Sequence, residues 1–459
     1  MIPNLRYEGP LDGPNLVECL AMTGLSPAAC RERASLLAQT FAALGRDLGA
    51  RPGAELGAFF VPGRIEVLGK HTDYAGGRSL VAAAERGFCL AVVPGEDRRV
   101  RVCDVSLGES VEFDLDPDLR PTVGHWSNYP MTVARRLARN FPTARLGATI
   151  ALASDLPAAA GMSSSSALMV AVFAALNHVN QVTASRAFRD NAASLTDLAG
   201  YLGTVENGQT FGSLEGDRGV GTFGGSEDHT AMLCAQPEKL CQYAYCPVRF
   251  EQALPVPEGY TFAIGTSGVL AEKTGQAMEK YNRASRLVAE IQRRWAQHTG
   301  RCETLAAAIA SGPNAPEELR AMLQASGGPF SSEDLLTRLE HFFVENEQVI
   351  PQAGQALACG DVIGFGLAVD RSQGAAEELL GNQVPETSAL ARAARQSGAV
   401  AASAFGAGFG GSVWALVETG RIEPFLQSWA ERYRQAFPAA ADRARFFATA
   451  AGPAAFQVC

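Results

Sequence analysis

The chain has 459 residues, of which 47% are hydrophobic and 19% are charged, and its formal net charge is −9. This length allows two or three domains with sizeable buried cores. Nucleic acid and anionic membrane surfaces both repel an acidic protein, so the charge excludes them as main partners.

The sequence also bears on where the protein works. Its longest apolar stretches are shorter than the roughly 18 residues that a membrane-spanning helix needs. The first residues lack the positively charged segment and apolar run of a signal peptide. The ten cysteines include no C-x-x-C pair, and we expect most of them to be small buried side chains in a reducing compartment. We therefore expect a cytoplasmic protein.

The first part of the chain is expected to hold an extension and a mixed region. Apolar residues at helical spacing around residues 25–48 predict a helical N-terminal extension, placed at 1–55, that carries no chemistry. Residues 56–235 are expected to contain both strands and helices. The patterns predict strands at 57–61 and 87–93 and helices at 131–140 and 163–177.

A second unit, residues 236–459, is expected to follow a Gln-Pro-Glu sequence at its start. We predict strands near 260–264 and 413–417 with long helices between them, at 271–299 and 332–358. No regular βαβ repeat, Walker A motif or glycine fingerprint after a strand is present, which argues against a Rossmann or P-loop enzyme. The pattern favours an α+β fold.

Three segments carry residues suited to chemistry. Residues 62–77, Pro-Gly-Arg-Ile-Glu-Val-Leu-Gly-Lys-His-Thr-Asp-Tyr-Ala-Gly-Gly, place a cation, an imidazole, a carboxylate and four glycines in one predicted strand and turn. They are typical of the substrate site of a sugar kinase.

The second segment, residues 156–167, has a glycine and four serines before an apolar helix, where free N–H groups and the helix dipole can hold phosphate. In the third, residues 403–412, four glycines allow close approach of the backbone. Taken separately, these two could also be a helix cap and a glycine-rich hairpin.

Together and in this order, the segments resemble the three motifs of the GHMP kinases. The first is similar to the galactokinase form Gly-Arg-x-Asn-x-x-Gly-Glu-His-x-Asp-Tyr-x-Gly-Gly. Residues 125–129 match the Trp-x-Asn-Tyr stretch of galactokinases, and residues 266–269 and 281–283 resemble their Asn-Ser-x-Val and Tyr-Asn-x-Arg positions. Residues 205–229 look like the segment from Ala-Glu-Asn/His to Gly-Ile-Met-Asp-Gln, with a longer intervening loop.

The resemblance implies a two-domain GHMP kinase fold with the active site in the cleft between the domains. The N-terminal domain would be residues 56–235, with the substrate motif and the serine-rich loop, and the C-terminal domain would be residues 236–459. The implied cofactors are ATP and Mg²⁺, and the implied partner is a small sugar. We expect a monomer or a small homo-oligomer.

Two residues match the family's catalytic pair. Asp228 stands at the position of the aspartate that accepts the proton of the sugar's anomeric hydroxyl, and Arg64 matches the arginine that lies beside that aspartate and stabilises developing charge. Without the family match, Asp228 could be an acidic residue in a helix's first turn, and Arg64 could pair with Glu66 or another carboxylate.

Nucleotide and metal ligands are implied in the same way. The phosphates would bind at Gly161 and the serines Ser163, Ser164, Ser165 and Ser166, and at Gly406 and Gly408 of the third segment. Magnesium would be held by Glu206 and by a serine hydroxyl, for which Ser165 is the first choice. Two protein ligands are enough, because Mg²⁺ prefers few protein oxygens together with phosphates and water. The choice among the four serines stays open. Ala159 replaces a family glycine here, and Ser403 and Phe405 replace the usual arginine and threonine.

The sugar-binding residues include one departure from the family. His71, Asp73 and Tyr281 match sugar-contacting residues, whereas Lys70 stands where galactokinases have a glutamate. Either Lys70 reads the carboxylate of a uronate such as galacturonate or glucuronate, with Arg78 reinforcing the field, or it pairs with Glu66, which replaces the family's asparagine.

Three hypotheses follow. The first is an ATP-dependent kinase acting on the anomeric hydroxyl of galactose or a close relative. The second is a uronic-acid 1-kinase, and the third is a non-catalytic regulator that binds sugar and ATP. Retention of Arg64, Asp228 and Glu206 argues against the regulator, because a pure binder needs no base beside the anomeric oxygen.

Overall fold

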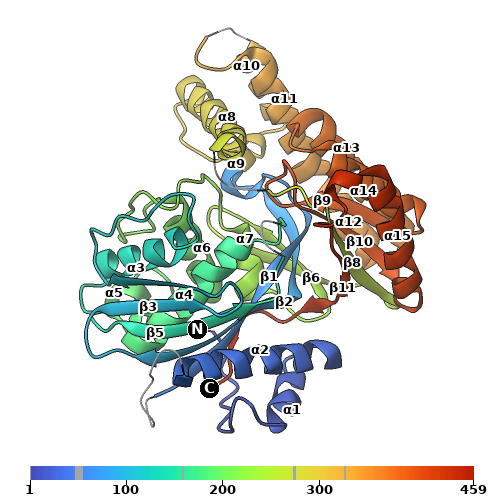
Figure 1. The fold of residues 1–459 in the computed structure, drawn as a ribbon. Coiled ribbons are helices and arrows are strands. Elements are labelled where there is room, and N and C mark those ends of the chain that lie inside the picture. The colour runs from blue at the N-terminus through green and yellow to red at the C-terminus, as the bar shows by residue number, and fades with distance from the viewer. Residues whose placement is uncertain (1, 47–54, 158–159, 272–274, 325–326) are drawn as a thin grey trace.

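The computed structural model describes residues 2–46, 55–157, 160–271, 275–324 and 327–459. Two sheets dominate it, one of nine strands and one of four (Figure 1). Within the described residues, no helix is long and apolar enough to cross a membrane.

The large sheet is built around a long antiparallel pair, β1 (Gly57–Leu68) and β2 (Arg78–Pro94). Its main strand order is β13-β1-β2-β5-β3-β4; β12 and β6 also pair with β2, and β7 pairs with β6. Strands β3 and β5 pair in parallel. The other strands of this sheet are β3 (Arg99–Asp104), β4 (Glu109–Asp114), β5 (Ala148–Ser154), β6 (Lys239–Ala244), β7 (Arg249–Pro255), β12 (Ala451–Gly452) and β13 (Phe456–Gln457).

Helices cover both faces of this sheet (Figure 1). On one face, the almost wholly apolar helix α4 (Ser164–Asn180) buries residues 166–176 against the sheet, because a helix that is apolar all round must be surrounded by protein. Beside it lie α3 (Asn128–Asn140), α5 (Arg186–Arg189), α6 (Leu195–Asn207) and α7 (Glu227–Cys234). The N-terminal helices α1 (Asn15–Ala21) and α2 (Pro27–Arg46) pack on the opposite face.

The four-stranded sheet has the order β11-β8-β10-β9 and is antiparallel throughout. Both of its faces are buried: along β10, Trp414 and Leu416 enter one core while Val413 and Ala415 enter another. Its strands are β8 (Tyr260–Thr266), β9 (Ala401–Phe405), β10 (Ser412–Glu418) and β11 (Phe446–Thr449). Helices α12 (Ile350–Ala358), α13 (Val362–Ala375), α14 (Pro385–Gln396) and α15 (Ile422–Ala436) cover it.

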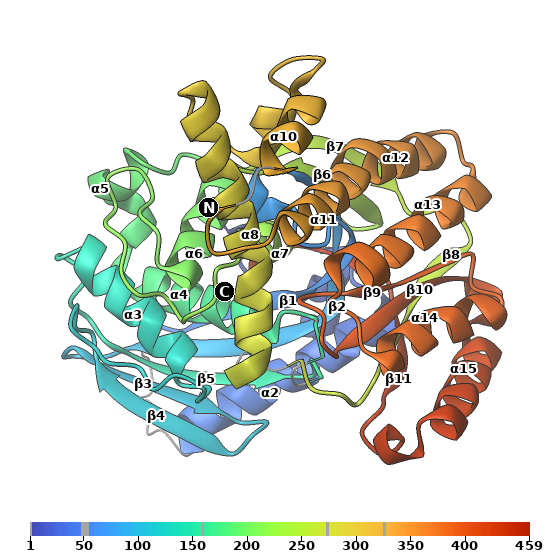
Figure 2. The ribbon, with the colours of Figure 1, turned by 90° about the horizontal axis from the view of Figure 1, so that it is seen from above.

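A third layer of helices lies above the turn that joins β1 to β2. It consists of α8 (Gly275–Thr299), α9 (Leu305–Ile309), α10 (Ala315–Gln324) and α11 (Ser332–Phe343), and its apolar core includes Ala75 of that turn. Seen from above, α8 lies between the helices of the first sheet and those of the second (Figure 2). This placement brings α8 and α11 over the 62–77 segment.

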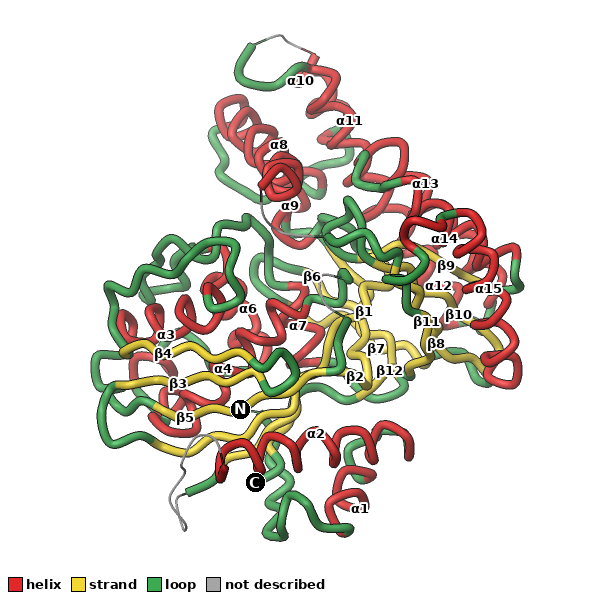
Figure 3. Tube along the Cα trace, in the orientation of Figure 1, coloured by secondary structure: helices red, strands yellow, loops and turns green. Residues whose placement is uncertain are grey.

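The expected α+β class is confirmed (Figure 3), and the predicted elements are present with altered bounds. The strand expected at 57–61 continues to Leu68, and the helix expected over 332–358 is helical throughout but contains a π-helical turn at Val344–Val349. Part of the extension (47–54), residues 272–274 and Ala159 lie outside the described residues. Strands β6 and β7 follow the boundary expected at 235 yet belong to the large sheet, so that division stays a prediction.

The expectation that most of the cysteines are buried was wrong. All ten are free, as expected from their spacing, but only Cys30, Cys89 and Cys241 are buried. Three others are exposed: Cys246, Cys302 and Cys359. Cysteine spacing excludes a metal knuckle, yet it does not tell which side chains face the core.

Candidate active site

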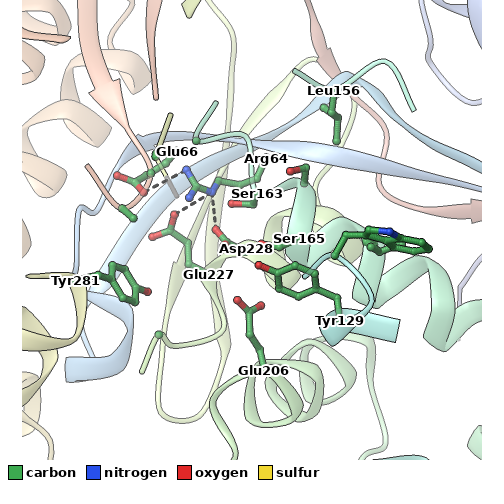
Figure 4. Close-up of a pocket in the computed structure, with 18 of the residues that line it drawn as sticks. Arg64, Glu66, Tyr129, Leu156, Ser163, Ser165, Glu206, Glu227, Asp228 and Tyr281 are labelled. Atoms are coloured by element: carbon green, nitrogen blue, oxygen red, sulfur yellow. Dashed lines mark hydrogen bonds and ion pairs between the residues drawn. The ribbon is translucent and has the colours of Figure 1, made fainter. Parts of the chain in front are cut away.

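A cavity of about 460 Å³ is lined by residues from both expected domains (Figure 4). Most of the predicted site residues line it: Arg64, His71, Asp73, Gly161, Ser163, Ser164, Ser165, Glu206, Asp228, Tyr281 and Gly406. Lys70, Ser166 and Gly408 do not. Segments far apart in sequence therefore converge on one pocket.

The two glycine-rich segments touch each other at one end of the cavity. A Cβ at Gly406 would lie 2.9 Å from the carbonyl oxygen of Gly161, and both residues have positive φ, so glycine is needed at each. Ser163, also left-handed, precedes α4 and makes no side-chain capping bond to it. The N–H groups of the first turn of α4 are thus available to an anion. Gly408 instead packs against Asn382.

An arginine and a carboxylate meet at the centre of the cavity (Figure 4). Arg64, on β1, places its Nε 2.7 Å from Oδ1 of Asp228, in the first turn of α7. The same guanidinium lies 3.2 Å from Glu66 Oε2 and 3.6 Å from Glu227 Oε1. One cation therefore faces three carboxylates in a largely buried cluster.

The acidic side chains of this cluster lie close together, and this shifts the pKa values of its members. Burial lowers the pKa of Arg64, but the carboxylates of Asp228, Glu66 and Glu227 more than offset this and hold that pKa above its ordinary value. Burial, and then repulsion from Glu66, raise the pKa of Glu227 well above 4.5. The pKa of Glu66 is also raised, mainly by burial. Three negative charges around one positive charge are costly, so this cluster favours the protonated forms of Glu227 and Glu66 more than an isolated glutamate in water does.

One polar end of the cavity is shaped by His71, Asp73 and Tyr281. Asp73 Oδ2 accepts a hydrogen bond from the backbone N–H of Glu227 at 3.1 Å, which fixes the start of α7 against the turn. A Cβ at Gly225 would lie 2.4 Å from that oxygen, so the glycine permits the contact. The rings of His71 and Tyr281 are 5.2 Å apart. Burial, and then Asp73, raise the pKa of Tyr281 well above 10, which keeps its hydroxyl protonated.

The other end of the cavity is aromatic. Trp126 and Tyr129, just before and within the first turn of α3, line it together with Leu107 and Leu156. Flat apolar rings of this kind suit a purine base. The cavity thus runs from an aromatic end, past the phosphate-suited loop, to a polar end beside Asp73.

Comparisons with known proteins bear on this arrangement. The profile of the GHMP kinases N-terminal domain matches residues 128–209, that of the C-terminal domain residues 355–435, and the galactokinase galactose-binding signature residues 48–94. The galactokinase of Chloroflexus aggregans is 28% identical over 377 residues, 81% of this chain and 86% of its own. That of Actinobacillus pleuropneumoniae is 27% identical over 380 residues, 82% of this chain and 89% of its own.

Solved structures agree on the fold. The galactokinase of Lactococcus lactis, solved with galactose, superposes with a TM-score of 0.74 over 92% of this chain and 99% of its own, at 24% identity. A D-glycero-D-manno-heptose 1-phosphate kinase from Bacteroides thetaiotaomicron gives a TM-score of 0.53 over 88% and 99%, at 12% identity. Both GHMP kinase domains are matched in this chain, which is similar to the galactokinases.

In this kinase, Lys70 is turned away from the cavity. Its side chain is fully buried, and its Nζ donates to Ser372 Oγ at 2.9 Å. Ser372 Oγ donates in turn to Glu345 Oε1 at 3.0 Å. Within the described residues no ion pair joins Lys70 to Glu66, so the alternative in which these two neighbours form one was wrong, although the charge of Lys70 still acts to lower the pKa of Glu66. The lysine is instead compensated by a glutamate of the π-helical turn, some 275 residues further along the chain.

Arg78 does not reinforce a field in the cavity either. Its guanidinium pairs with Glu251 at 3.1 Å and with Glu347 at 3.9 Å, outside the pocket lining. Glu66, near the end of β1, does line the cavity. This kinase therefore lacks the glutamate that galactokinases have at position 70, and Glu66, four residues earlier, places a carboxylate in the cavity.

The predicted metal ligands Glu206 and Ser165 both line the cavity. The neighbouring Ser166 Oγ hydrogen-bonds to Glu206 Oε2 at 2.7 Å and to Asp228 Oδ2 at 3.3 Å. In the described part of the chain, no group of three or more His, Cys, Asp or Glu side chains could hold a metal by itself. Mg²⁺ in phosphoryl transfer needs only one or two carboxylates, because phosphate oxygens and waters complete its shell. The donor set therefore fits a nucleotide-bound Mg²⁺.

Two functional candidates escaped the sequence reasoning. Glu227 adds a third acid beside Arg64, and its signal was the replacement of the family's methionine next to Asp228. Arg338 of α11 is buried and donates to the carbonyl oxygen of His71 and, at 3.2 Å, to Tyr74 Oη. No motif marked Arg338, because its role depends on a contact 267 residues away in sequence.

Replacing Glu227 by Gln is expected to make stability less dependent on pH. A glutamate whose folded pKa is raised stabilises the fold fully below its unfolded pKa, about 4.5, and loses that contribution as pH rises through the folded pKa. Between pH 5 and pH 8 we therefore expect the free energy of unfolding of wild type to fall by more than that of the variant. Denaturant titrations at pH 5 to 8 measure this. Glu318→Gln, an exposed site on α10, is the matched control; parallel curves for Glu227→Gln and wild type would contradict the expectation.

Proposed function

We propose that this protein is an ATP-dependent sugar kinase that transfers the γ-phosphate to the anomeric hydroxyl of galactose or a close neutral relative. The observation that carries the proposal is the Arg64–Asp228 pair. It stands between the phosphate-suited loop of α4 and the sugar-facing residues Asp73 and Tyr281. The galactokinase relatives support galactose as the first sugar to test.

Each residue has a defined task in this reaction. Asp228 accepts the proton of the anomeric hydroxyl as that oxygen forms its bond to the γ-phosphorus, and the bond from phosphorus to the β-phosphate oxygen breaks, releasing ADP. Arg64 orients the carboxylate and stabilises the charge on the transferring group. His71, Asp73 and Tyr281 hold the sugar hydroxyls, and Gly161 with Ser163 to Ser165 and Gly406 enclose the phosphates.

Magnesium, when bound with the nucleotide, neutralises phosphate charge. Glu206 would hold it together with a serine hydroxyl. Ser165 lines the cavity, whereas Ser166 is already hydrogen-bonded to Glu206, so Ser165 is the proposed ligand and Ser166 the residue that orients the carboxylate. A hydrogen bond from a residue that does not itself touch the metal fixes the direction of a metal ligand.

A neutral sugar is favoured over a uronate by the charges on the cavity. The acids that line it are Glu66, Asp73, Asp104, Glu206, Glu227 and Asp228, whereas Lys70, on which the uronate alternative depends, does not line it. A carboxylate on the sugar would meet this negative field. Glu66 can instead accept a hydrogen bond from a sugar hydroxyl, as the family's glutamate at position 70 does.

Replacing Lys70 by Glu is therefore expected to destabilise the protein without changing its preferred sugar. The new carboxylate would be buried near Glu345, and an uncompensated buried charge costs about 3 kcal/mol or more. Thermal unfolding and kcat/KM for galactose and galacturonate measure both effects. Lys70→Met removes the charge but keeps much of the packing and is the control. Appreciable wild-type turnover of galacturonate that disappears in Lys70→Met would contradict the expectation.

The deciding assay is ADP release with Mg-ATP against galactose, galacturonate, glucuronate, arabinose and N-acetylgalactosamine, with NMR of the product. Turnover of galactose with phosphate on C1 would support the proposal. Sugar and ATP binding without turnover of any sugar would favour the regulator.

A further inference from the structure

A second cavity, of about 310 Å³, is lined by the C-terminal half of α3, whereas the first turn of that helix lines the active site. Four arginines and two aspartates line it: Arg120, Arg135, Arg139, Arg218, Asp118 and Asp217. It is therefore basic in a chain whose net charge is −9.

The charges in this cavity are unevenly paired. Asp217 forms an ion pair with Arg135, whose Nε lies 2.7 Å from Oδ2. Its other oxygen, Oδ1, lies 3.8 Å from Arg136 Nη1. Within the described residues, no ion pair joins Arg120, Arg139 or Arg218 to a carboxylate. Arg139 donates only to the carbonyl oxygens of Gly216 and Pro117, each at 3.4 Å. Three guanidinium groups are thus open to an anion.

Buried side chains form the floor of the cavity. Arg135 and Asp217 have side chains only 5% and 4% exposed, and Arg135 Nη2 donates to the carbonyl oxygen of Gly219 at 3.2 Å. Buried pairing fixes the loop around residue 217 against α3, so the cavity does not depend on mobile surface side chains alone.

The loop concerned is the stretch that is longer here than in the galactokinase pattern. It leaves α6 just after Glu206 and returns to α7 just before Asp228. Inside it, the N–H of Val220 donates to the carbonyl oxygen of Glu206 at 2.8 Å, and a Cβ at Gly219 would lie 2.3 Å from that oxygen. A ligand held by residues 217 and 218 would therefore act on backbone that packs directly on Glu206.

We propose that this cavity binds a phosphate monoester and that its occupancy alters the kinase through the 208–226 loop. A phosphate monoester offers three terminal oxygens to the three open guanidinium groups, whereas a carboxylate offers two oxygens and a halide is a single atom. The volume admits a small phosphorylated metabolite and lies at the lower end of the range for organic ligands. Helix α3 connects the two sites: Tyr129 in its first turn lines the active site, and Arg135 and Arg139 line this cavity.

The test compares wild type with Arg139→Gln/Arg218→Gln. Calorimetric titrations use inorganic phosphate, a hexose 1-phosphate and ADP, which separate a free phosphate, a sugar phosphate and a nucleotide as the source of the group. We expect at least one probe to bind the double variant at least tenfold more weakly, a tenfold change being about 1.4 kcal/mol. Mg-ATP binding and thermal stability should be unchanged, because neither arginine lines the active site.

Arg186→Gln/Arg189→Gln, on α5, removes the same charge outside the cavity and should bind all probes as wild type does. Equal affinities in wild type and Arg139→Gln/Arg218→Gln for every probe would overturn the proposal. Steady-state kinetics with the bound probe test the coupling: kcat or the KM for ATP should change in wild type and not in the double variant. Binding without any kinetic change would overturn the coupling.

Discussion

Asp228→Asn is expected to lower kcat by about 10³-fold, within the range of 10²–10⁴ that a positioned general base contributes. The asparagine keeps the shape of the side chain and can still contact Arg64, but it cannot accept the proton of the sugar hydroxyl. Because sugar binding depends on His71, Asp73 and Tyr281, the sugar's dissociation constant should stay close to that of wild type. ADP release and calorimetry with galactose measure the two effects.

The exposed carboxylate Asp190 offers a control for this variant. Asp190→Asn, beside Arg186 on the surface, should have wild-type turnover. If Asp228→Asn turned over sugar at the wild-type rate, Asp228 would not be the base. If it lost sugar binding together with turnover, the residue would be needed to form the site rather than to move a proton.

Arg64→Met is expected to abolish turnover and to destabilise the fold together. Removing the guanidinium leaves Glu66, Glu227 and Asp228 without the cation that faces all three. Breaking a buried ion cluster from one side costs about 3–5 kcal/mol. The melting temperature should therefore fall, and kcat/KM should fall by more than the about 10²–10³-fold that one lost transition-state donor explains.

A second substitution separates the two roles of Arg64. Arg64→Met/Glu66→Gln removes one of the repelling carboxylates, so it should recover part of the lost stability but none of the activity. Thermal unfolding and ADP release on the single and double variants give the comparison. Recovery of turnover in the double variant would show that Arg64 acts only by balancing charge.

The sequence was informative where short motifs carry the chemistry. The serine run before an apolar helix predicted the start of α4 within one residue, because helix periodicity and a capping segment are local signals. The two glycine-rich segments were expected to approach something closely, and Gly161 and Gly406 do so by touching each other. That partner could not be predicted, since no local pattern encodes a contact between residues 245 positions apart.

Position 70 shows where local reasoning fails. From sequence, Lys70 had two candidate partners, a substrate carboxylate and Glu66, because both are near in the motif. In the structure its Nζ is bound to Ser372 of α13, beside Glu345, and forms no ion pair with Glu66 within the described residues. A buried lysine must be compensated, but which acid does so depends on how α11–α13 pack over the 62–77 turn.

The sequence by itself determined the class of protein, the order of its motifs and the residues suited to phosphoryl transfer, because these depend on residue type and spacing along the chain. The tertiary structure alone decided that Glu66 and Glu227 share the guanidinium of Arg64, that Lys70 faces away from the cavity, and that the long loop after Glu206 forms a basic cavity with α3. Burial and charge pairing arise between segments distant in sequence, and they become defined only when the two sheets and their helices are packed together.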